Sequence, residues 1–382
     1  METRIRETLA RVVEWRRYLH RHPEVSYEEK ETSAFAASRL ESMGWKVRTG
    51  VGGYGVVADL DGAAPGKRIA LRADMDALPI QDAKTVEYAS TVPGIMHACG
   101  HDGHTSALLG AAELLAETRS EWNGSIRLLF QPAEEIPPGG AQAMIRDGAL
   151  EGVDEIYGIH LWSQFPVGTV QTVAGPIMAA SDEFRITITG KGGHGGLPHN
   201  TIDALSIGSH FVVNVQSVIS RNTDPIEPGV ISVGSMHAGT TFNVIAEQCT
   251  LQGTVRSMSA ETRMHLKRRI EEVLDYTCKM FGAEYDLNYI MGYPPVINHP
   301  EQTERVREIA GELFGSDAVV TCRPMMAGED FSYYLERIPG CFLFVGAGND
   351  KITAPHHHPM FDIDERSLEM SVRLLYALAT RR

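Results

Sequence analysis

Five short segments of this 382-residue chain are rich in side chains that bind metal ions or transfer protons. Their carboxylate, imidazole and thiol groups suit zinc- or manganese-like cations. A pair of such cations can polarise an amide carbonyl and lower the pKa of a water molecule. A carboxylate that is not a ligand can then accept the proton of that water. In chain order, the segments are Asp74-Met75-Asp76, His97-Ala98-Cys99-Gly100-His101-Asp102-Gly103-His104, Glu134-Glu135, His160 and His356-His357-His358.

Each segment, taken alone, also has an ordinary structural explanation. Asp74 and Asp76 are typical of a solvated turn. Glu134-Glu135 is typical of a helix N-terminus, where acidic side chains complement the helix dipole. A single histidine at a strand end, such as His160, is typical of a hydrogen-bonded core residue. Together the segments favour a metal site, because burying so many ionisable groups without a cation would be costly.

The elements that must position these segments alternate between strand-like and helix-like patterns. Four predicted strands lead into ligand-rich segments, the last of them through a glycine-rich loop, and the segment 97–104 immediately precedes a predicted helix at Thr105–Thr118. In open α/β sheets, ligands bind beyond the carboxyl ends of the strands, so we expect these segments to converge at one sheet edge. The four predicted strands are Arg68–Arg72, Ser125–Phe130, Glu155–His160 and Cys341–Val345.

The pattern changes between Ala179 and Tyr289, where the expected order is strand, helix, two strands, helix and strand. This βαββαβ order is typical of a ferredoxin-like sandwich. We therefore predict an α/β protein with a mainly parallel sheet in residues 1–178 and 293–382 and an inserted ferredoxin-like α+β domain in residues 179–292. The elements expected in the inserted domain are Glu183–Thr189, Asp203–Ser220, Gly229–Met236, Gln248–Arg256, Ala260–Phe281 and Tyr285–Ile290.

Composition narrows the classes of partner. The chain is 43% hydrophobic and 22% charged, as in ordinary soluble globular proteins. Its net charge of -14 repels phosphate backbones, so we expect no nucleic-acid partner. The charged segment 1–20 does not resemble a signal peptide, and no apolar run approaches the roughly 20 residues that span a bilayer, so we expect no membrane association. Five scattered cysteines predict reduced thiols and a cytoplasmic location.

Seven motifs form an ordered set over nearly the whole chain. They are Arg21-His22-Pro23-Glu24, Arg72-Ala73-Asp74-Met75-Asp76-Ala77-Leu78-Pro79, His97 to His104, Gln131-Pro132-Ala133-Glu134-Glu135, Gly192 to His199, Thr241-Phe242-Asn243-Val244-Ile245 and Ala327-Gly328-Glu329-Asp330-Phe331. This set closely resembles the N-acyl-amino-acid amidohydrolases, which include hippurate hydrolases and auxin-amino-acid conjugate hydrolases. That group belongs to the larger family of aminoacylases and carboxypeptidase G-type metallopeptidases. The resemblance implies hydrolysis of the amide bond of small N-acyl amino acids, such as N-acetyl or N-benzoyl compounds.

By position, the resemblance also implies the ligands of two divalent metal ions per subunit. A family motif with histidine two residues before proline selects His357 from the run 356–358, with His358 as the alternative. We expect zinc or manganese, or cobalt or nickel in purified protein. The implied metal ligands are Cys99, His101, Glu135, His160 and His357.

One position departs from the carboxypeptidase-like branch of the larger family. That branch begins its metal site with His-x-Asp and bridges the metals with an aspartate. This chain has Asp74 at the first position and Cys99 at the bridging position. A thiolate makes the site softer and more easily oxidised, so the sequence does not specify which metal is bound.

The resemblance implies roles for five further residues. Glu134 matches the general base, and Asp76 matches a carboxylate that orients a metal ligand. In the inserted domain, His194 resembles an oxyanion donor. Asn243 and Arg256 match residues that bind the carbonyl and carboxylate ends of the substrate, although an arginine such as Arg256 also suits a surface salt bridge. The family's inserted domain commonly forms dimers, so we expect a homodimer or homotetramer through this domain.

Three other functions fit parts of the sequence. Gly190 to Gly195 fits G-x-G-x-x-G after a strand, but no acidic residue lies about 20 positions downstream, as a dinucleotide site requires. A non-catalytic conjugate-binding relative would be expected to lose the base or several ligands, and all are filled here. A dipeptidase or carboxypeptidase would use the same metal site, and only the Cys99 type of site favours a deacylase. No motif specifies the acyl group or the amino acid.

Overall fold

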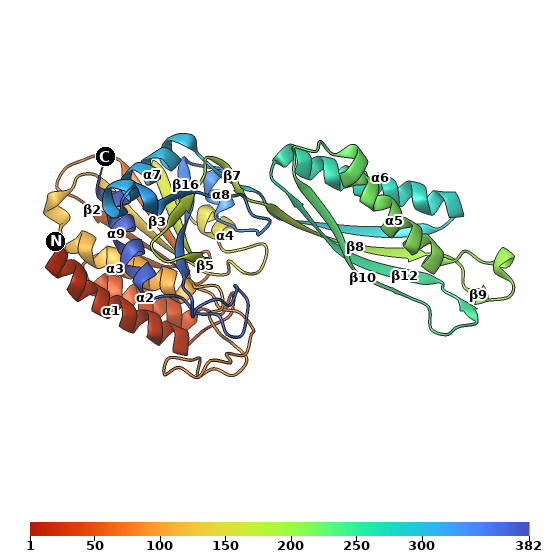
Figure 1. Ribbon diagram of the computed structural model, residues 1–382, viewed down its shortest axis with the longest axis horizontal. Helices are drawn as coiled ribbons and strands as arrows, with labels where there is room; N and C mark the ends of the chain where they lie inside the picture. Colours follow the sequence, from red (N-terminus) through yellow and green to blue (C-terminus); the bar gives the residue numbers. More distant parts are fainter. Residues whose placement is uncertain (382) are drawn as a thin grey trace. The chain divides into compact units, whose positions relative to one another are not determined.

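The computed structural model describes residues 1–381 as two units, between which the chain passes more than once. Unit 1 comprises Met1–Ile177, Ile297–Arg323 and the chain from Asp330 onward. Unit 2 comprises Met178–Val296 and Pro324–Glu329. Figure 1 shows both units in sequence colours, with helices packed against a sheet in each.

Unit 1 is built on an eight-stranded sheet. Its four central strands, β4, β3, β5 and β16, run parallel to one another. Antiparallel pairs join β2 to β4 and β6 to β16 on either side of this centre. In sheet order, the strands are β1 (Lys46–Val51), β2 (Gly55–Asp61), β4 (Ser125–Gln131), β3 (Arg68–Asp74), β5 (Glu155–Pro166), β16 (Gly340–Gly348), β6 (Val170–Thr172) and β15 (Val319–Thr321).

Helices cover this sheet. Helix α3 packs against α1, α9 and strand β3, and α7 packs against α9 and β16 (Figure 1). Most of α3 is buried, because it lies between the sheet and the two other helices. The helices of unit 1 are α1 (Glu2–Arg21), α2 (Lys30–Ser42), α3 (His101–Glu117), α4 (Ala141–Arg146), α7 (Pro300–Phe314), α8 (Ser332–Leu335) and α9 (Arg366–Thr380), with single 3₁₀ turns at Arg119–Glu121 and Ser316–Ala318.

The alternation of side chains along the strands separates two buried layers. In β16, Leu343 and Val345 belong to the large core shared with α3 and α9. The intervening Phe342 and Phe344 contact each other and the ring of His160 on β5. Because successive strand residues point to opposite faces, one sheet face carries the helix-covered core and the other carries aromatic rings beside His160.

Unit 2 is a four-stranded antiparallel sheet with two helices against it. The strand order β10-β12-β8-β13 is that of a ferredoxin-like sandwich, as the sequence predicts. Alternate residues of β8, such as Phe184 and Ile186, pack against α5 and α6 in one apolar core. The elements are β8 (Ala180–Thr189), α5 (Ala204–Asn222), β10 (Gly229–Ala238), β12 (Gln248–Ser257), α6 (Ala260–Phe281) and β13 (Glu284–Tyr293), with a small ladder of β9 (Gly193–His194) and β11 (Val244–Ile245) and a 3₁₀ turn at Pro198–Asn200.

Local sequence signals explain where the helices of unit 2 begin and end. The carboxylate of Asp203 accepts hydrogen bonds from the first backbone N–H groups of α5, and the hydroxyl of Ser259 does the same for α6. Gly282 ends α6 with a left-handed φ of 72°. The two-stranded pair β7 (Gly175–Met178) and β14 (Val296–Asn298) includes points at which the chain leaves and re-enters unit 1.

Several element boundaries differ from the sequence expectation. Strand β5 continues past His160 to Pro166, because it pairs with β16 as far as Gly348. Helix α3 begins at His101, four residues before the predicted start. The segment Pro324–Glu329, expected in the final part of the α/β domain, groups with unit 2. There the N–H of Ala179 lies within hydrogen-bond distance of the carbonyls of Met325 and Ala327.

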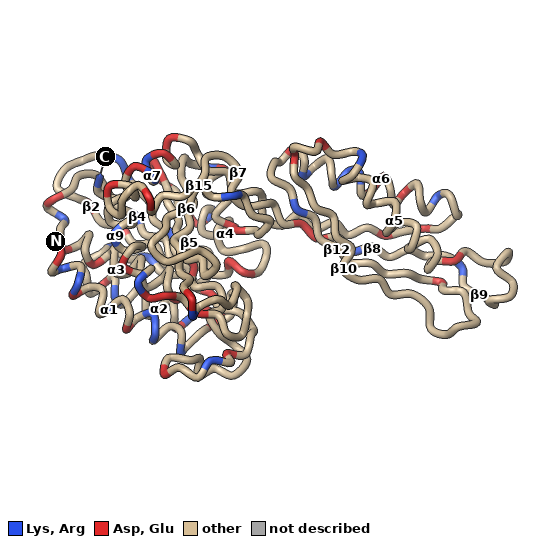
Figure 2. Tube along the Cα trace, viewed as in Figure 1, with Lys and Arg blue, Asp and Glu red and all other residues tan. Residues whose placement is uncertain are grey.

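Acidic and basic side chains are interspersed along α1 and α6 (Figure 2). Some of them pair, as in Arg11 with Glu113 on α3. Within residues 1–381, no helix is both long enough and apolar enough to cross a membrane.

Candidate metal centre

The ends of three neighbouring parallel strands and the first turn of α3 bring the ligand-rich segments together in unit 1. Strand β3 ends at Asp74, β4 leads to Glu134 and Glu135, and β5 carries His160. The N-terminus of α3 carries His101. This convergence follows from the parallel arrangement, because parallel strands present their carboxyl ends at the same edge of the sheet.

Potential ligand atoms of the described residues form five overlapping sets, and three of these sets contain two or more of the predicted metal ligands. Within each set, one ligand atom of each residue lies within 4.8 Å of the others. These three sets are Cys99 with His101 and His160, Cys99 with Glu135 and His357, and His101 with Glu134 and Glu135. Cys99 and His101 each belong to two of these three sets, so the three sets share members and form a cluster of six side chains.

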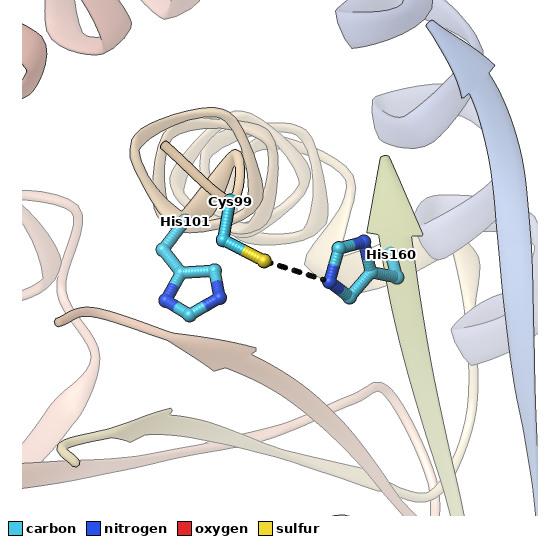
Figure 3. A group of neighbouring side chains, drawn as sticks. All are labelled: Cys99, His101 and His160. Carbon is cyan, nitrogen blue, oxygen red and sulfur yellow. Dashed lines mark hydrogen bonds between the residues drawn. The ribbon is translucent and has the colours of Figure 1, made fainter. Parts of the chain in front are cut away.

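Cys99 lies between two histidines (Figure 3). Its Sγ atom is 3.5 Å from Nε2 of His160. Burial, followed by the negative charges of Glu135 and Glu134, raises the pKa of the Cys99 thiol well above its ordinary value. A divalent cation in this place would supply the opposite charge and stabilise the thiolate, so the donor set fits a metal ion.

His101 also fits a metal ion. Its Nδ1 atom lies 2.9 Å from the carbonyl oxygen of Asp76, so Nδ1–H donates to that oxygen. The other ring nitrogen, Nε2, is then the atom that can bind a metal ion. Nε2 is buried and has no hydrogen-bond partner among the described residues, yet it lies 3.8 Å from Asp74 Oδ2, 4.0 Å from Glu134 Oε2 and 3.8 Å from Glu135 Oε1. Burial opposes the charged ring, but the carboxylates, Asp74 first, outweigh it and raise the pKa of His101 to about 10. The site therefore favours a positive charge at this point.

Glu134 and Glu135 lie in a turn rather than at a helix N-terminus, since the next helix, α4, begins at Ala141. The preceding residue, Ala133, has a left-handed φ of 54° and is fully buried. Its N–H donates to Oε1 of Glu29 at 2.7 Å. An L-residue adopts this backbone only where surrounding contacts hold it, so Glu29 stabilises the turn that directs the two glutamates into the cluster.

Asp76 lies behind the ligands and contacts two of them. Its Oδ2 atom accepts hydrogen bonds from the hydroxyl of Ser26 at 2.7 Å and from the N–H of Glu135 at 2.9 Å. Its Oδ1 atom is 3.2 Å from Nδ1 of His101. Burial raises the pKa of Asp76, but these contacts, that of His101 first, outweigh it and hold the pKa below its ordinary value. An ionised Asp76 therefore orients both His101 and Glu135.

Only one histidine of the run 356–358 joins the cluster. Nε2 of His357 is 3.3 Å from Oε1 of Glu135. His357 has a left-handed φ of 62°, and its N–H donates to the carbonyl of Ala98 at 2.8 Å, beside Cys99. The ring of His356 instead stacks on Trp162, and Nδ1 of His358 accepts from the N–H of Met360. The geometry thus favours His357 over its neighbours.

The three predicted substrate-contacting residues lie in unit 2. His194 and Asn243 adjoin the small β9–β11 ladder, where the N–H of Gly195 donates to the carbonyl of Asn243. Arg256 lies on β12, and its Nε donates to the carbonyl of Met326 at 3.1 Å rather than to a carboxylate. Burial lowers the pKa of Arg256. Unit 2 therefore brings His194 and Asn243 together at one small two-stranded ladder and holds the Arg256 guanidinium by backbone oxygens.

Sequence reasoning assigned no role to several buried residues around the cluster. Their polar character was visible, but their burial and their partners depend on contacts between distant segments. Asp330, for example, accepts from Arg72 and Gln131, which are on β3 and β4. The signal that could have found Arg72, His104 and Asp330 was their presence in the long motifs. The missed residues are Ser26, Glu29, Arg72, His104 and Asp330.

The chain is similar over most of its length to several known proteins. The chain is 48% identical over 370 residues to YhaA of Bacillus subtilis (strain 168), covering 96% of this chain and 93% of that protein. It is 47% identical over 294 residues to the N-acyl-L-amino acid amidohydrolase of Geobacillus stearothermophilus, covering 77% and 80%. Its fold matches the crystal structure of Bacillus subtilis YxeP, described as a dinuclear metal-binding peptidase of the M20 family, with a TM-score of 0.86, 34% identity and 98% of each chain covered.

The profile of one protein family extends over most of the chain. Residues 70–381 match Peptidase family M20/M25/M40, a range that contains every residue of the cluster. With this match and relatives above 40% identity over most of their length, the chain belongs to Peptidase family M20/M25/M40.

Proposed function

We propose that the chain hydrolyses the amide bond of small N-acyl amino acids and releases a carboxylic acid and an amino acid. The observation that carries this proposal is the cluster in which Glu134 and Glu135 lie beside His101, with Cys99, His160 and His357 around them. Relatives named for N-acyl-amino-acid hydrolysis support the same class of substrate.

Five side chains would hold two divalent cations, and zinc or manganese suits their mixture of thiolate, imidazole and carboxylate. Bound there, the cations would polarise the amide carbonyl and lower the pKa of a water molecule. The proposed ligands are Cys99, His101, Glu135, His160 and His357.

Glu134 is proposed to accept the proton of the water and pass it to the leaving nitrogen. Its neighbour Glu135 instead lies beside two of the proposed metal ligands. Its Oε1 atom is 3.3 Å from Nε2 of His357 and 3.8 Å from Nε2 of His101. The turn after Ala133 gives the two carboxylates different surroundings, which allows different tasks. Asp76 is proposed to orient His101 and Glu135 through the contacts described above.

Three residues of unit 2 are proposed to bind the substrate. His194 would donate to the developing oxyanion, and Asn243 would donate to the carbonyl end. The guanidinium of Arg256, a bidentate donor, suits the free carboxylate of the amino acid. Arg256 is partly buried, and its Nε donates to the carbonyl of Met326, which supports a guanidinium held in place to donate hydrogen bonds to an anion.

We also propose a homodimer or homotetramer assembled through unit 2. Helix α5 exposes Leu205, Ser209 and Val213, which are spaced four residues apart and so share one face. Strand β10, at the edge of the sheet, lies against the same helix. Exposed apolar side chains beside a sheet edge are typical of an interface between subunits.

A cytoplasmic location is proposed from the cysteines. All five are free and buried. Unpaired thiols in a large chain are typical of proteins kept in a reducing compartment.

The proposed reaction can be tested with a panel of substrates. Protein stripped with a chelator is reloaded with zinc, manganese or cobalt and supplied with N-acetyl, N-benzoyl and longer N-acyl amino acids, beside dipeptides. We expect metal-restored release of amino acid from the acyl compounds. Release from dipeptides alone would favour a dipeptidase, and no release with any metal would refute the proposal.

A further inference from the structure

The main chain of Leu161 is a junction between three histidines. Its N–H donates to Nε2 of His104 at 2.8 Å. Its carbonyl accepts from Nδ1 of His160 at 2.9 Å and from Nε2 of His356 at 3.1 Å. Because a carbonyl oxygen can only accept, His160 carries its proton on Nδ1 and leaves Nε2 free to face Cys99. The orientation of His160 therefore depends on where the Leu161 main chain lies.

On the side that faces β3, the main chain of Leu161 lies beyond the end of the strand pairing. Strand β5 pairs with β3 only as far as Gly158, opposite Arg72. On its other side, the pairing with β16 continues through His160 and Leu161. His104 thus supplies, on the β3 side, the acceptor that a strand would otherwise provide.

The tautomer of His104 is determined by Asp74. Nδ1 of His104 lies 2.6 Å from Oδ1 of Asp74, and Oδ2 of Asp74 accepts from Arg72 at 2.6 Å. An aspartate paired with arginine is an acceptor, so His104 carries its proton on Nδ1 and accepts at Nε2. The side chains of Arg72, Asp74 and His104 are each no more than 1% exposed, so water does not compete for these contacts.

Asp74 and His104 could instead be metal ligands themselves, since their donor atoms lie near those of His101. Their hydrogen bonds argue against this. Both ring nitrogens of His104 and both carboxylate oxygens of Asp74 already have close partners, at 2.6 to 2.8 Å. Nε2 of His101, in contrast, has no hydrogen-bond partner within residues 1–381.

We propose that Asp74 and His104 form a positioning pair that holds the Leu161 main chain and thereby presents Nε2 of His160 to a metal ion. The pair acts through Leu161 and does not touch the metal or the substrate. The inference rests on the proposed role of His160 as a ligand.

Two isosteric substitutions separate the two hydrogen bonds of His104. In His104→Gln, the amide oxygen can take the place of Nε2 and accept from Leu161. In His104→Asn, the amide nitrogen can take the place of Nδ1 and donate to Asp74, but nothing reaches Leu161. His104→Asn thus keeps the contact with Asp74 and loses the one with Leu161, and His104→Gln does the reverse, so a role confined to the Asp74 contact would give the opposite order of effects.

The test is metal affinity, measured without substrate by chelator competition with zinc, and the thiolate-to-metal absorption of the cobalt-loaded protein. We expect His104→Asn to lose about 10- to 100-fold in affinity and to change the cobalt spectrum, with His104→Gln within about threefold of the parent protein. Equal effects in the two variants, or a weaker effect in His104→Asn, would overturn the proposal. Thermal unfolding of the metal-free variants serves as the folding control.

A measurement on the unaltered protein covers the case in which a variant does not fold. Long-range ¹H–¹⁵N correlation of histidine rings reports which nitrogen carries the proton. We expect Nδ1–H at both His104 and His160 in the metal-loaded protein. A proton on Nε2 of His104 would overturn the proposal. Neither readout uses turnover, so a failure of the amide-hydrolase assignment would appear separately, as metal binding without product release.

Discussion

Glu29 illustrates how a single buried carboxylate can be central to the site without carrying a metal-ligand signature. It accepts from the N–H groups of Tyr27 and Ala133, at 3.0 and 2.7 Å, and so holds the turn before Glu134. Burial, followed by the nearby charge of Asp76, raises the pKa of Glu29 to about 7. The folded protein therefore keeps a proton on Glu29 at a pH where the unfolded chain has lost it.

This raised pKa predicts a pH-dependent effect of Glu29→Gln. As the pH rises from the ordinary glutamate pKa toward about 7, the unfolded chain ionises Glu29 while the folded protein keeps the proton, which costs about 1 to 3 kcal/mol of stability for a shift of this size. Glutamine keeps the acceptor oxygen but does not ionise. In metal-free protein, the melting temperature of the variant relative to the parent should therefore be higher at pH 8 than at pH 5. The same difference at both pH values would contradict the pKa assignment.

At the residue scale, the sequence predicted side chains whose chemistry is distinctive, and the structure gathers Cys99, His101 and His160 into one cluster. It did not predict the partners that orient them. Glu29 meets Ala133 across 104 positions of the chain, and Asp330 meets Arg72 across 258. Such pairs depend on the tertiary fold, and nothing in the local pattern of either segment indicates them.

At the scale of elements, strands and helices with strong periodicity were predictable, and their ends were less so. The start of α3 at His101 is an example: Gly100, with φ of 92°, precedes it, and the first turn is buried against β5. Propensity alone places the helix later, after the glycine and histidine residues. The strands β1 and β2, which extend the sheet beyond β4, were not among the predicted strands.

Close packing between helices gives a prediction with an internal control. A Cβ atom added at Gly110 of α3 would lie 2.4 Å from Cγ2 of Val12 on α1, whereas one at Gly311 of α7 would find its nearest neighbour at 3.9 Å. Alanine otherwise favours a helix over glycine by about 1 kcal/mol. Gly311→Ala should therefore raise the melting temperature, and Gly110→Ala should lower it by displacing α1. Equal shifts of the same sign would show that the α1–α3 contact does not limit residue size.

At the scale of the whole molecule, the predicted fold class is confirmed: a mainly parallel α/β sheet carries an inserted ferredoxin-like unit, and the family resemblance holds. Alternation of elements and the long motifs made both predictable. The assignment of Pro324–Glu329 to unit 2 was not, because it depends on hydrogen bonds to Ala179 far away in sequence.

The proposed assembly is also a property of the whole molecule. If unit 2 forms the interface, Val213→Asp places a charge on the exposed apolar face of α5 and should convert the assembly to a 41.9 kDa monomer. Light scattering on the eluting protein measures the mass. Val86→Asp introduces the same charge at an exposed valine of unit 1, so it is the matched control and should leave the mass unchanged. A monomeric parent protein at micromolar concentration would contradict the proposal.

The division of labour between two adjacent acids is the central claim, and one comparison tests it most directly. Metal content and turnover of an N-acyl amino acid are measured on the same preparations of Glu134→Gln and Glu135→Gln. We predict that Glu134→Gln keeps its metal and loses about 10²- to 10⁴-fold in turnover, as expected for a general base, whereas Glu135→Gln also loses metal. Equal metal loss in both variants, or full activity in Glu134→Gln, would contradict the account.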